Sequence, residues 1–437
     1  MSGVSGVIAK AYQASKVLGQ TDGKVRDAIL KQIAFSLPYH KKKILEENQK
    51  DLTAAKKANL SPAFIERLKL TEQKIADMAA QVQAVQQLPD PLNVIVSQTQ
   101  LDQGLMLYQT TVPLGLVGVI FEARPDALVQ IASLCIKSGN GAIIKGGSEA
   151  SATQNFLGSL IAAEVNKVAP GALVFLQSRQ DAIAMLSHDK EISLLILRGS
   201  KELITSIKNN TKIPVLGHSE GICHLYVDKD ASVEMAVAIA VDAKCQYPAA
   251  CNSIETLLVH KRIAKQFLPV LARAYFEHGV EMRADSESLP LIAKADKKGQ
   301  FKHLLKPATE KDWATEYNAL IISIKIVGSL KEAIAHINQY GSKHTDAIVT
   351  NDDAAAKTFL DEVDASSVMV NCSTRFADGY RYGKGAELGI NTGKIHARGP
   401  TGIEGLLTTK YQLVGSGQVV ATYVGEQAKR FVHKKIK

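Results

Sequence analysis

The stretch YPAACNSI (residues 247–254) joins two segments with different hydrophobic patterns. Before it, residues 231–244 carry apolar side chains at helical spacing, and after it residues 254–260 have the short apolar run of a buried strand. Pro248 ends the helix, and the two small alanines that follow it allow a ligand to come close to the backbone. Cys251 is therefore predicted to lie at a corner between a helix and a strand.

This corner suits Cys251 for nucleophilic chemistry. A thiol attacks as its thiolate, and the free backbone N–H groups of a turn stabilise both the thiolate and a later oxyanion. The alternative is an inert packing cysteine, because free cysteine is among the most buried residue types. We expect that packing role for the other four cysteines, which lie in apolar or strand segments: Cys135, Cys223, Cys245 and Cys372.

Length and composition indicate a globular protein with more than one domain. The 437 residues exceed what one hydrophobic core usually supports, and 46% hydrophobic with 22% charged residues is ordinary for such proteins. No run of about 18 apolar residues is present, and the N-terminal segment lacks the apolar core of a signal peptide. The five cysteines show no metal-ligand spacing, so we expect no metal site, reduced thiols and a cytoplasmic protein.

The formal charge of +9 arises from 52 Lys and Arg against 43 Asp and Glu residues. Such a charge attracts nucleic acid, anionic lipid or a small anionic substrate. Aromatic residues make up only 5%, and the basic clusters at 41–43 and 433–437 have no interleaved stacking side chains. We therefore expect neither a nucleic-acid nor a membrane partner. A basic binding protein remains as an alternative, and it predicts salt-sensitive binding to polyanions that does not need Cys251.

Two kinds of pattern precede the cysteine corner. Residues 1–88 are predicted to be helical, with helix starts at Ser61 and Thr71. Residues 93–112 predict a hairpin that turns near Gly104, and we expect residues 417–424 to be its β partner.

Strand and helix patterns alternate along the rest of the chain. Residues 114–213 predict βαβ units in a parallel sheet, which binds ligands at the carboxyl ends of its strands. Residues 222–371 repeat the alternation and predict a second α/β domain. Residues 372–400 are Gly-rich and charged, and we expect a long loop there that borders the active site. The predicted fold class is α/β.

Six stretches, in the same order along most of the chain, resemble the gamma-glutamyl phosphate reductases, a family within the aldehyde dehydrogenase superfamily. They are PLGLVGVIFEARPD (113–126), GNGAIIKGGSEA (139–150), LILRGSKELI (195–204), HSEGICHLYVD (218–228), YPAACNSIETLLVH (247–260) and VNCSTRFADGYRYGKGAELGINTGKIHARGPTGIEGL (370–406). The resemblance implies two parallel-sheet α/β domains and a β-hairpin oligomerisation arm.

The resemblance also implies domain bounds. Residues 1–222, with part of 376–410, would form a nucleotide-binding domain that carries the arm at 93–112. Residues 223–375 would form the catalytic cysteine domain, and residues 411–437 a C-terminal oligomerisation segment. A homo-oligomer, either a dimer or a tetramer, is expected, and a contact with glutamate 5-kinase is left open.

The implied cofactor is NADPH, although the chain has no G-x-G-x-x-G fingerprint. The resembled superfamily binds its nucleotide without that fingerprint. Lys145 matches the lysine that contacts the adenosine ribose or its phosphate, Gly199 and Ser200 match the residues at a helix start near the pyrophosphate, and Glu316 matches the glutamate of the nicotinamide ribose. From the residues alone, a surface lysine, a helix cap and a solvated carboxylate explain these positions equally well.

One departure from the superfamily pattern is informative. Oxidising members place a water-activating glutamate a little over thirty residues before the cysteine, and here His218 stands at or near that place, with Glu220 close by. An acyl phosphate needs no such base, because phosphate is a good leaving group. An oxidising dehydrogenase that uses His218 or Glu220 as the base remains the alternative, and phosphate dependence separates the two.

The substrate residues are assigned by position and charge. The superfamily asparagine that stabilises the oxyanion is missing from residues 121–125, so Arg124 becomes the candidate for binding phosphate or carboxylate, with a structural salt bridge as its alternative. The other candidates are Asn252, Asn371, Arg375 and Arg398. The resemblance implies reduction of gamma-glutamyl phosphate to glutamate 5-semialdehyde through a Cys251 thioester, the second step of proline biosynthesis from glutamate.

Overall fold

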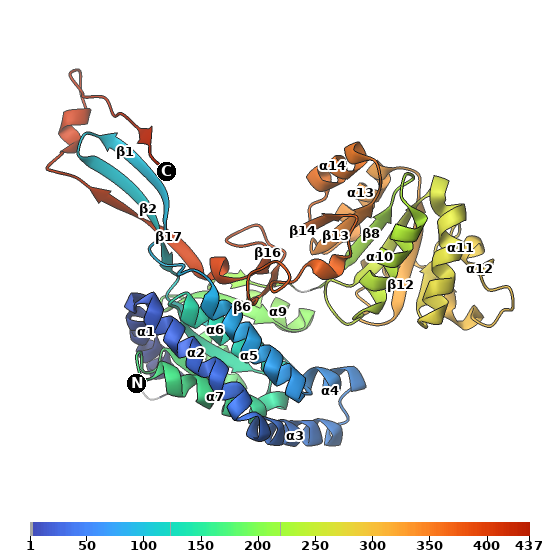
Figure 1. Cartoon of the computed structure of the whole chain (residues 1–437), viewed down its shortest axis with the longest axis horizontal. Coiled ribbons are helices and arrows are strands. Elements are labelled where there is room, and N and C mark those ends of the chain that lie inside the picture. The colour runs from blue at the N-terminus through green and yellow to red at the C-terminus, as the bar shows by residue number, and fades with distance from the viewer. Residues whose placement is uncertain (1–2, 123, 219) are drawn as a thin grey trace.

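Two parallel sheets and an antiparallel arm organise the chain (Figure 1). The computed structural model describes residues 3–437 except residues 123 and 219. A five-stranded sheet forms the first lobe, a seven-stranded sheet forms the second lobe, and the arm projects away from both lobes. This arrangement confirms the predicted fold class.

Five helices open the chain, as predicted for residues 1–88. They are α1 (Val4–Gln20), α2 (Gly23–Tyr39), α3 (Lys41–Lys57), α4 (Pro62–Leu68) and α5 (Glu72–Gln87). The two predicted starts are confirmed, because the Ser61 side chain accepts a hydrogen bond from the backbone of α4 and the Thr71 side chain from that of α5.

The five-stranded sheet has the order β5-β4-β3-β6-β7, and all its pairs are parallel. Its strands are β3 (Leu116–Phe121), β4 (Gly141–Gly146), β5 (Leu173–Phe175), β6 (Ile192–Arg198) and β7 (Val215–Leu216). Its helices are α6 (Pro125–Lys137), α7 (Ser151–Val165), α8 (Arg179–Met185) and α9 (Lys201–Lys208). One hydrophobic cluster packs α2, α5, α6 and α7 on one face, and another packs α1, α8 and α9 on the other. Every residue of β3 is therefore buried, as its apolar sequence predicts.

The seven-stranded sheet has the order β11-β10-β12-β9-β8-β13-β14 and is also parallel. Its strands are β8 (Cys223–Val227), β9 (Ile254–His260), β10 (Glu281–Ala284), β11 (Leu305–Pro307), β12 (Ile321–Val327), β13 (Thr345–Val349) and β14 (Ser367–Val370). Its helices are α10 (Val233–Cys245), α11 (Lys261–Glu277), α12 (Leu289–Ala293), α13 (Leu330–Tyr340) and α14 (Asp353–Glu362). The sequence pattern missed β10, α12 and β11, because charged side chains such as Glu281 and Arg283 interrupt the apolar run near this edge of the sheet.

The arm is a four-stranded antiparallel sheet of order β17-β2-β1-β18. The predicted hairpin consists of β1 (Ile95–Asp102) and β2 (Leu105–Pro113), but its predicted partner was wrong. Along the full length of β2 the partner is β17 (Leu407–Val414), and β18 (Lys434–Lys435) pairs with β1. Residues 417–424 lie outside the strands, because the chain turns away from β2 at residues 415–417.

Residues 372–400 were expected to be a loop without structure of its own. The structure instead places there a short antiparallel pair, β15 (Gly389–Asn391) and β16 (Gly399–Thr401), which returns the chain to the first lobe. Leu388 and Ile403 join the core of that lobe. Within the part of the chain that the structure describes, no helix combines the length and apolar character needed to cross a membrane.

Candidate active site

Cys251 lies at the predicted corner, in a turn between the end of α10 and the start of β9. Backbone hydrogen bonds shape this turn, from the Ala250 N–H to the Tyr247 carbonyl at 3.2 Å and from the Ser253 N–H to the Ala250 carbonyl at 2.9 Å. Cys251 is half-buried, so the turn leaves its side chain partly accessible.

The backbone of Cys251 is held by the chain that enters β8. A Cβ added to Gly221 would lie 2.6 Å from the Cα of Cys251, so only glycine allows this approach. Two residues later, the Cys223 thiol donates to the Cys251 carbonyl at 3.2 Å. Burial raises the pKa of Cys223 well above its ordinary value, so this thiol stays protonated and serves packing, as predicted.

The site forms where the carboxyl ends of the strands in the first lobe face the amino ends of the strands in the second lobe. Cys251 precedes β9, Cys223 begins β8, and His344 directly precedes β13, so all three lie at the amino ends of neighbouring parallel strands. The first lobe contributes the carboxyl ends of its strands, where Lys145 and Arg198 are placed. The predicted site residues therefore lie at the carboxyl ends of the strands in the first sheet, but at the amino ends of the strands in the second sheet.

Two imidazoles stand at the thiol. Nitrogen atoms of His218 and His344 and the sulfur of Cys251 all lie within 4.8 Å of one another, and the two rings meet edge to face with their centroids 4.7 Å apart. His218 Nδ1 donates to the Ile390 carbonyl at 2.7 Å. Burial lowers the pKa of both histidines, so both imidazoles are neutral at neutral pH. The sequence pointed to His218 but missed His344, which no motif near the cysteine marks.

Three guanidinium groups interact with the charge of the Cys251 thiolate: Arg124, Arg198 and Arg375. Arg124 is half exposed and lies 3.5 Å from Asp126, whose charge raises the pKa of Arg124. Arg198 is mostly buried and pairs with Glu387 at 3.4 Å. The sequence analysis did not select Arg198, although its position at the end of β6 directly before Gly199 could have indicated it.

Asn252 and Arg375 are engaged with each other beside the turn. The Arg375 guanidinium donates to the Asn252 amide oxygen, and its Nε donates to Gln246 at 2.9 Å. The Asn252 amide nitrogen donates to the Ala377 carbonyl at 2.8 Å. These contacts fasten the segment after β14 to the cysteine turn, so the Asn252 amide holds the site together.

Asn371 and Arg398 make their contacts elsewhere. The Asn371 amide exchanges two hydrogen bonds with the backbone of Thr350, at 2.9 and 3.0 Å. Arg398 donates to the Asp364 carboxylate at 2.9 Å, a group that Lys343 and Lys394 also contact. Both side chains have structural partners, and a substrate role for either stays a prediction.

The predicted cofactor residues lie along a path from β4 to the cysteine turn. Lys145 lines a cavity of about 200 Å³ together with Gly146, Gly147 and Ser148. A Cβ on Gly146 would meet the end of the Gln154 side chain, which would have to shift. Burial lowers the pKa of Lys145.

Gly199 and Ser200 directly precede α9. The Ser200 N–H donates to the Glu122 carboxylate at 2.9 Å, and the Ser200 hydroxyl accepts from the Leu203 N–H at 3.4 Å as the cap of α9. Glu316 lies near the cysteine turn, where the Gly221 N–H and the His218 side chain both act to lower the pKa of its carboxyl. Burial raises the pKa of Glu316.

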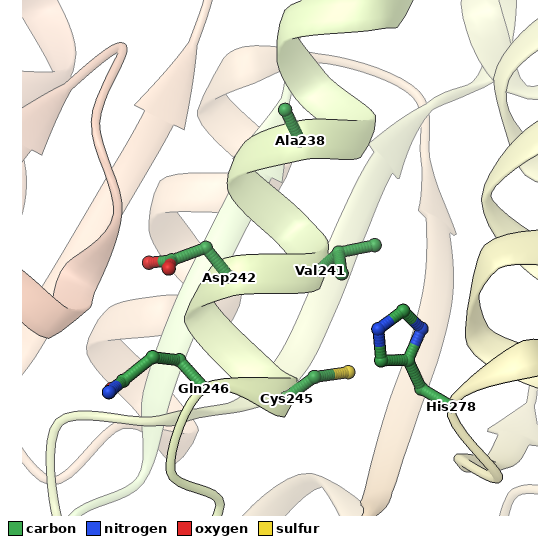
Figure 2. A pocket seen from close by; sticks show the side chains of 6 residues that line it. All are labelled: Ala238, Val241, Asp242, Cys245, Gln246 and His278. Atoms are coloured by element: carbon green, nitrogen blue, oxygen red, sulfur yellow. The ribbon is translucent and has the colours of Figure 1, made fainter.

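A larger hollow of about 450 Å³ lies between α10 and α11, outside this site (Figure 2). Ala238, Val241, Asp242, Cys245, Gln246 and His278 line it, and none of them is a predicted site residue. Burial raises the pKa of Cys245 to about 11, so its thiol stays protonated at neutral pH.

Comparisons with known proteins agree with this geometry. The family model "Aldehyde dehydrogenase family" matches residues 2–313. The chain is 50% identical to a gamma-glutamyl phosphate reductase of Methanosarcina acetivorans, over 98% of this chain and 96% of the relative, and 51% identical to one from a Cyanothece species, over 97% and 96%. The crystal structure of gamma-glutamyl phosphate reductase from Thermotoga maritima superposes with a TM-score of 0.89 at 35% identity, covering 95% of this chain and 99% of that one.

Proposed function

The chain belongs to the aldehyde dehydrogenase family and, within it, to the gamma-glutamyl phosphate reductases, and on that basis we propose that it reduces gamma-glutamyl phosphate to glutamate 5-semialdehyde in proline biosynthesis. The observation that carries the proposal is the partly accessible Cys251 turn, whose sulfur interacts electrostatically with the guanidinium groups of Arg124, Arg198 and Arg375. These cations match the phosphate and carboxylate groups of the substrate.

Cys251 performs the covalent chemistry in this proposal. Its sulfur attacks the acyl carbon, the bond from that carbon to the phosphate oxygen breaks, and a thioester forms. Backbone N–H groups of the turn stabilise the oxyanion. After reduction, the carbon–sulfur bond breaks, the aldehyde leaves and the thiolate is restored. His218, in place of a glutamate, fits a site where the thioester exchanges with phosphate and is not hydrolysed by water.

The residues present fit a nicotinamide cofactor, which supplies the hydride when bound. Gly146 and Gly147 line the cavity at the end of β4 next to Lys145, whose ammonium group would pair with a 2′-phosphate and so favour NADPH. The N-terminus of α9, which follows Gly199 and Ser200, would meet the pyrophosphate, which would replace the Glu122 carboxylate as the acceptor of the Ser200 N–H. Glu316 would accept hydrogen bonds from the nicotinamide ribose.

The arginines would bind the anionic groups of the substrate. Arg124 is the half-exposed one and would meet the phosphate, whereas Arg198 and Arg375 are held by Glu387, Asn252 and neighbouring groups and would shape the pocket.

The reverse reaction tests the proposal. Reduction of NADP by the wild type with glutamate 5-semialdehyde should require phosphate and should vanish in Cys251→Ala. Cys245→Ala is the matched control, because this cysteine lies in the same segment and should leave the reaction unchanged. Equal activity without phosphate would identify the oxidising alternative, and activity in Cys251→Ala would overturn the assignment of the nucleophile.

The arm is proposed to hold two copies of the chain together. Large apolar side chains stand exposed on it, among them Tyr411, Leu413, Val414 and Val420. Exposed apolar surface of this kind is typical of an interface, and the long edge strand β17 offers unpaired backbone groups as well.

A further inference from the structure

His344 is the one member of the thiol cluster that neither the sequence pattern nor the proposed chemistry uses. Its side chain is completely buried, and it sits between the positive-φ residue Lys343 and the first residue of β13. The neighbouring strand β8 begins at Cys223, and β9 follows the Cys251 turn. The sheet order therefore brings this imidazole to the nucleophile.

The hydrogen bonds of His344 leave one ring nitrogen available. Nδ1 lies 2.9 Å from the Thr345 hydroxyl and 3.6 Å from the Cys223 sulfur. Nε2 is buried and has no conventional hydrogen-bond partner among the described residues. A buried, unpartnered nitrogen costs free energy unless a group such as a thiol shares a proton with it. When Nδ1 carries the hydrogen and donates to Thr345, the lone pair is on Nε2.

The two histidines at the thiol are not equivalent. A nitrogen of His344 lies within 4.8 Å of the Cys251 sulfur, and its interaction with that side chain acts to raise the pKa of His344 against the larger effect of burial. His218 is directed by its hydrogen bond to Ile390 and lies in the field of Glu316 and Arg198. His344 is thus the imidazole in position to take the thiol proton.

One cysteine and two imidazoles also resemble a zinc ligand set, and tetrahedral sites use these donors. The charges nearby favour a different use. Arg124, Arg198 and Arg375 all interact with the same sulfur, and together they repel a divalent cation while attracting an anionic substrate. The cluster is therefore suited to moving a proton.

We propose that His344 is the proton acceptor for Cys251, a catalytic residue of the reaction proposed above. The S–H bond breaks, the proton passes to Nε2, and the electron pair stays on sulfur as the attacking thiolate. The proton then leaves with the departing phosphate, which is released as hydrogen phosphate, so charge and atoms balance. The inference rests on the proposed function for the identity of the substrate, but the proton transfer itself needs no substrate.

Alkylation of Cys251 tests the proton transfer directly. The rate of modification by iodoacetamide is measured from about pH 5 to about pH 10 without substrate or cofactor, and mass spectrometry locates the alkylated cysteine. The titratable groups that face His344 are Cys251, His218 and Cys223, and the three arginines face the thiolate. Only the thiolate reacts, so the profile reports the proton on Cys251.

The variants are His344→Asn and, as the matched control, His218→Asn. We expect His344→Asn to slow the alkylation at neutral pH by about tenfold and to move the profile toward alkaline pH, and His218→Asn to keep the wild-type profile. An unchanged profile in a folded His344→Asn would overturn the proposal, as would the same shift in both variants. His344→Gln provides a second test if the asparagine variant does not fold.

For the glutamine variants, His218→Gln is the matched control, and equal profiles for His344→Gln and His218→Gln would overturn the proposal. Because the alkylation uses no substrate, its outcome is independent of the phosphate experiment, and the failure of one does not imply the failure of the other.

Discussion

Gly221 links the nucleophile to the predicted cofactor residue Glu316. Its Cα packs against the backbone of Cys251 so closely that a Cβ would lie 2.6 Å from the Cys251 Cα, and its N–H donates to the Glu316 carboxylate. The same residue therefore contacts both the backbone of the nucleophile and the carboxylate that is predicted to bind the nicotinamide ribose.

Gly221→Ala should displace the cysteine turn and reduce kcat by about a hundredfold, because a shift of about 1 Å at a reacting group has an effect of that size. Steady-state kinetics would measure the loss. The control is Gly393→Ala, which should retain activity because the nearest neighbour of the added Cβ lies 3.4 Å away. Gly279→Ala is not a suitable control, because Gly279 has a positive φ. A fully active Gly221→Ala would show that the turn adjusts freely.

Variants of Arg124 and Arg398 should have different effects, one on substrate binding and the other on stability. Arg124→Gln should raise the KM for the acyl phosphate by about tenfold to a hundredfold, because a hydrogen bond to a charged group contributes about 1.5–3 kcal/mol. Arg398→Gln removes the contact with Asp364 and should lower the thermal midpoint without a comparable change in KM. A rise in KM only in Arg398→Gln would contradict this division of roles.

Lys145→Ala should weaken the binding of NADPH more than that of NADH. The lysine lines the cavity at the end of β4, and its ammonium group is the cation there that would meet a 2′-phosphate. Fluorescence titration with both nucleotides would measure the difference, with the exposed lysine variant Lys357→Ala as control. Equal losses for NADPH and NADH would mean that Lys145 contacts a part common to both.

Asp312 should make stability depend on acid pH. Burial acts to raise the pKa of this carboxyl, but hydrogen bonds from Arg283 and Thr309 outweigh it and lower the pKa to about 2. A lowered folded-state pKa stabilises the fold above the unfolded value of about 4, and this stabilisation is lost as the pH falls toward 2. The loss should be about 2 kcal/mol.

Urea unfolding of the wild type and Asp312→Asn at several pH values would measure this effect. The wild type should be the more stable at neutral pH, and the difference should shrink as the pH falls from about 4 to about 2. A difference that does not change with pH would assign the contribution of Asp312 to packing alone.

The arm should control assembly. Tyr411→Asp combined with Leu413→Asp places two charges on the exposed face of β17 and should produce a smaller species in size-exclusion chromatography with light scattering. Val270→Asp, at an exposed valine of α11, is the matched control and should leave the mass unchanged. Identical masses for all three proteins would exclude β17 from the interface.

Local patterns were sufficient for much of the fold. The helix before Cys251 and the strand after it were predicted because hydrophobic periodicity and a proline act within a few residues. The predicted partner of β2 was wrong. Residues 407–414 and 417–424 both have β-forming side chains, and contacts between distant segments decide which of them pairs with β2. The missed strand β10 carries Glu281 and Arg283, whose charges hide its strand character.

The sequence by itself determined the α/β class, the cysteine at a helix-to-strand corner and the family resemblance, because each depends on neighbouring residues or on the order of short motifs along the chain. Only the tertiary structure decided which groups meet the thiol. His344 and Arg198 lie far from Cys251 in the sequence. They reach it because the amino ends of the parallel strands in one sheet face the carboxyl ends of the parallel strands in the other. Such proximity depends on strand order, which no local pattern encodes.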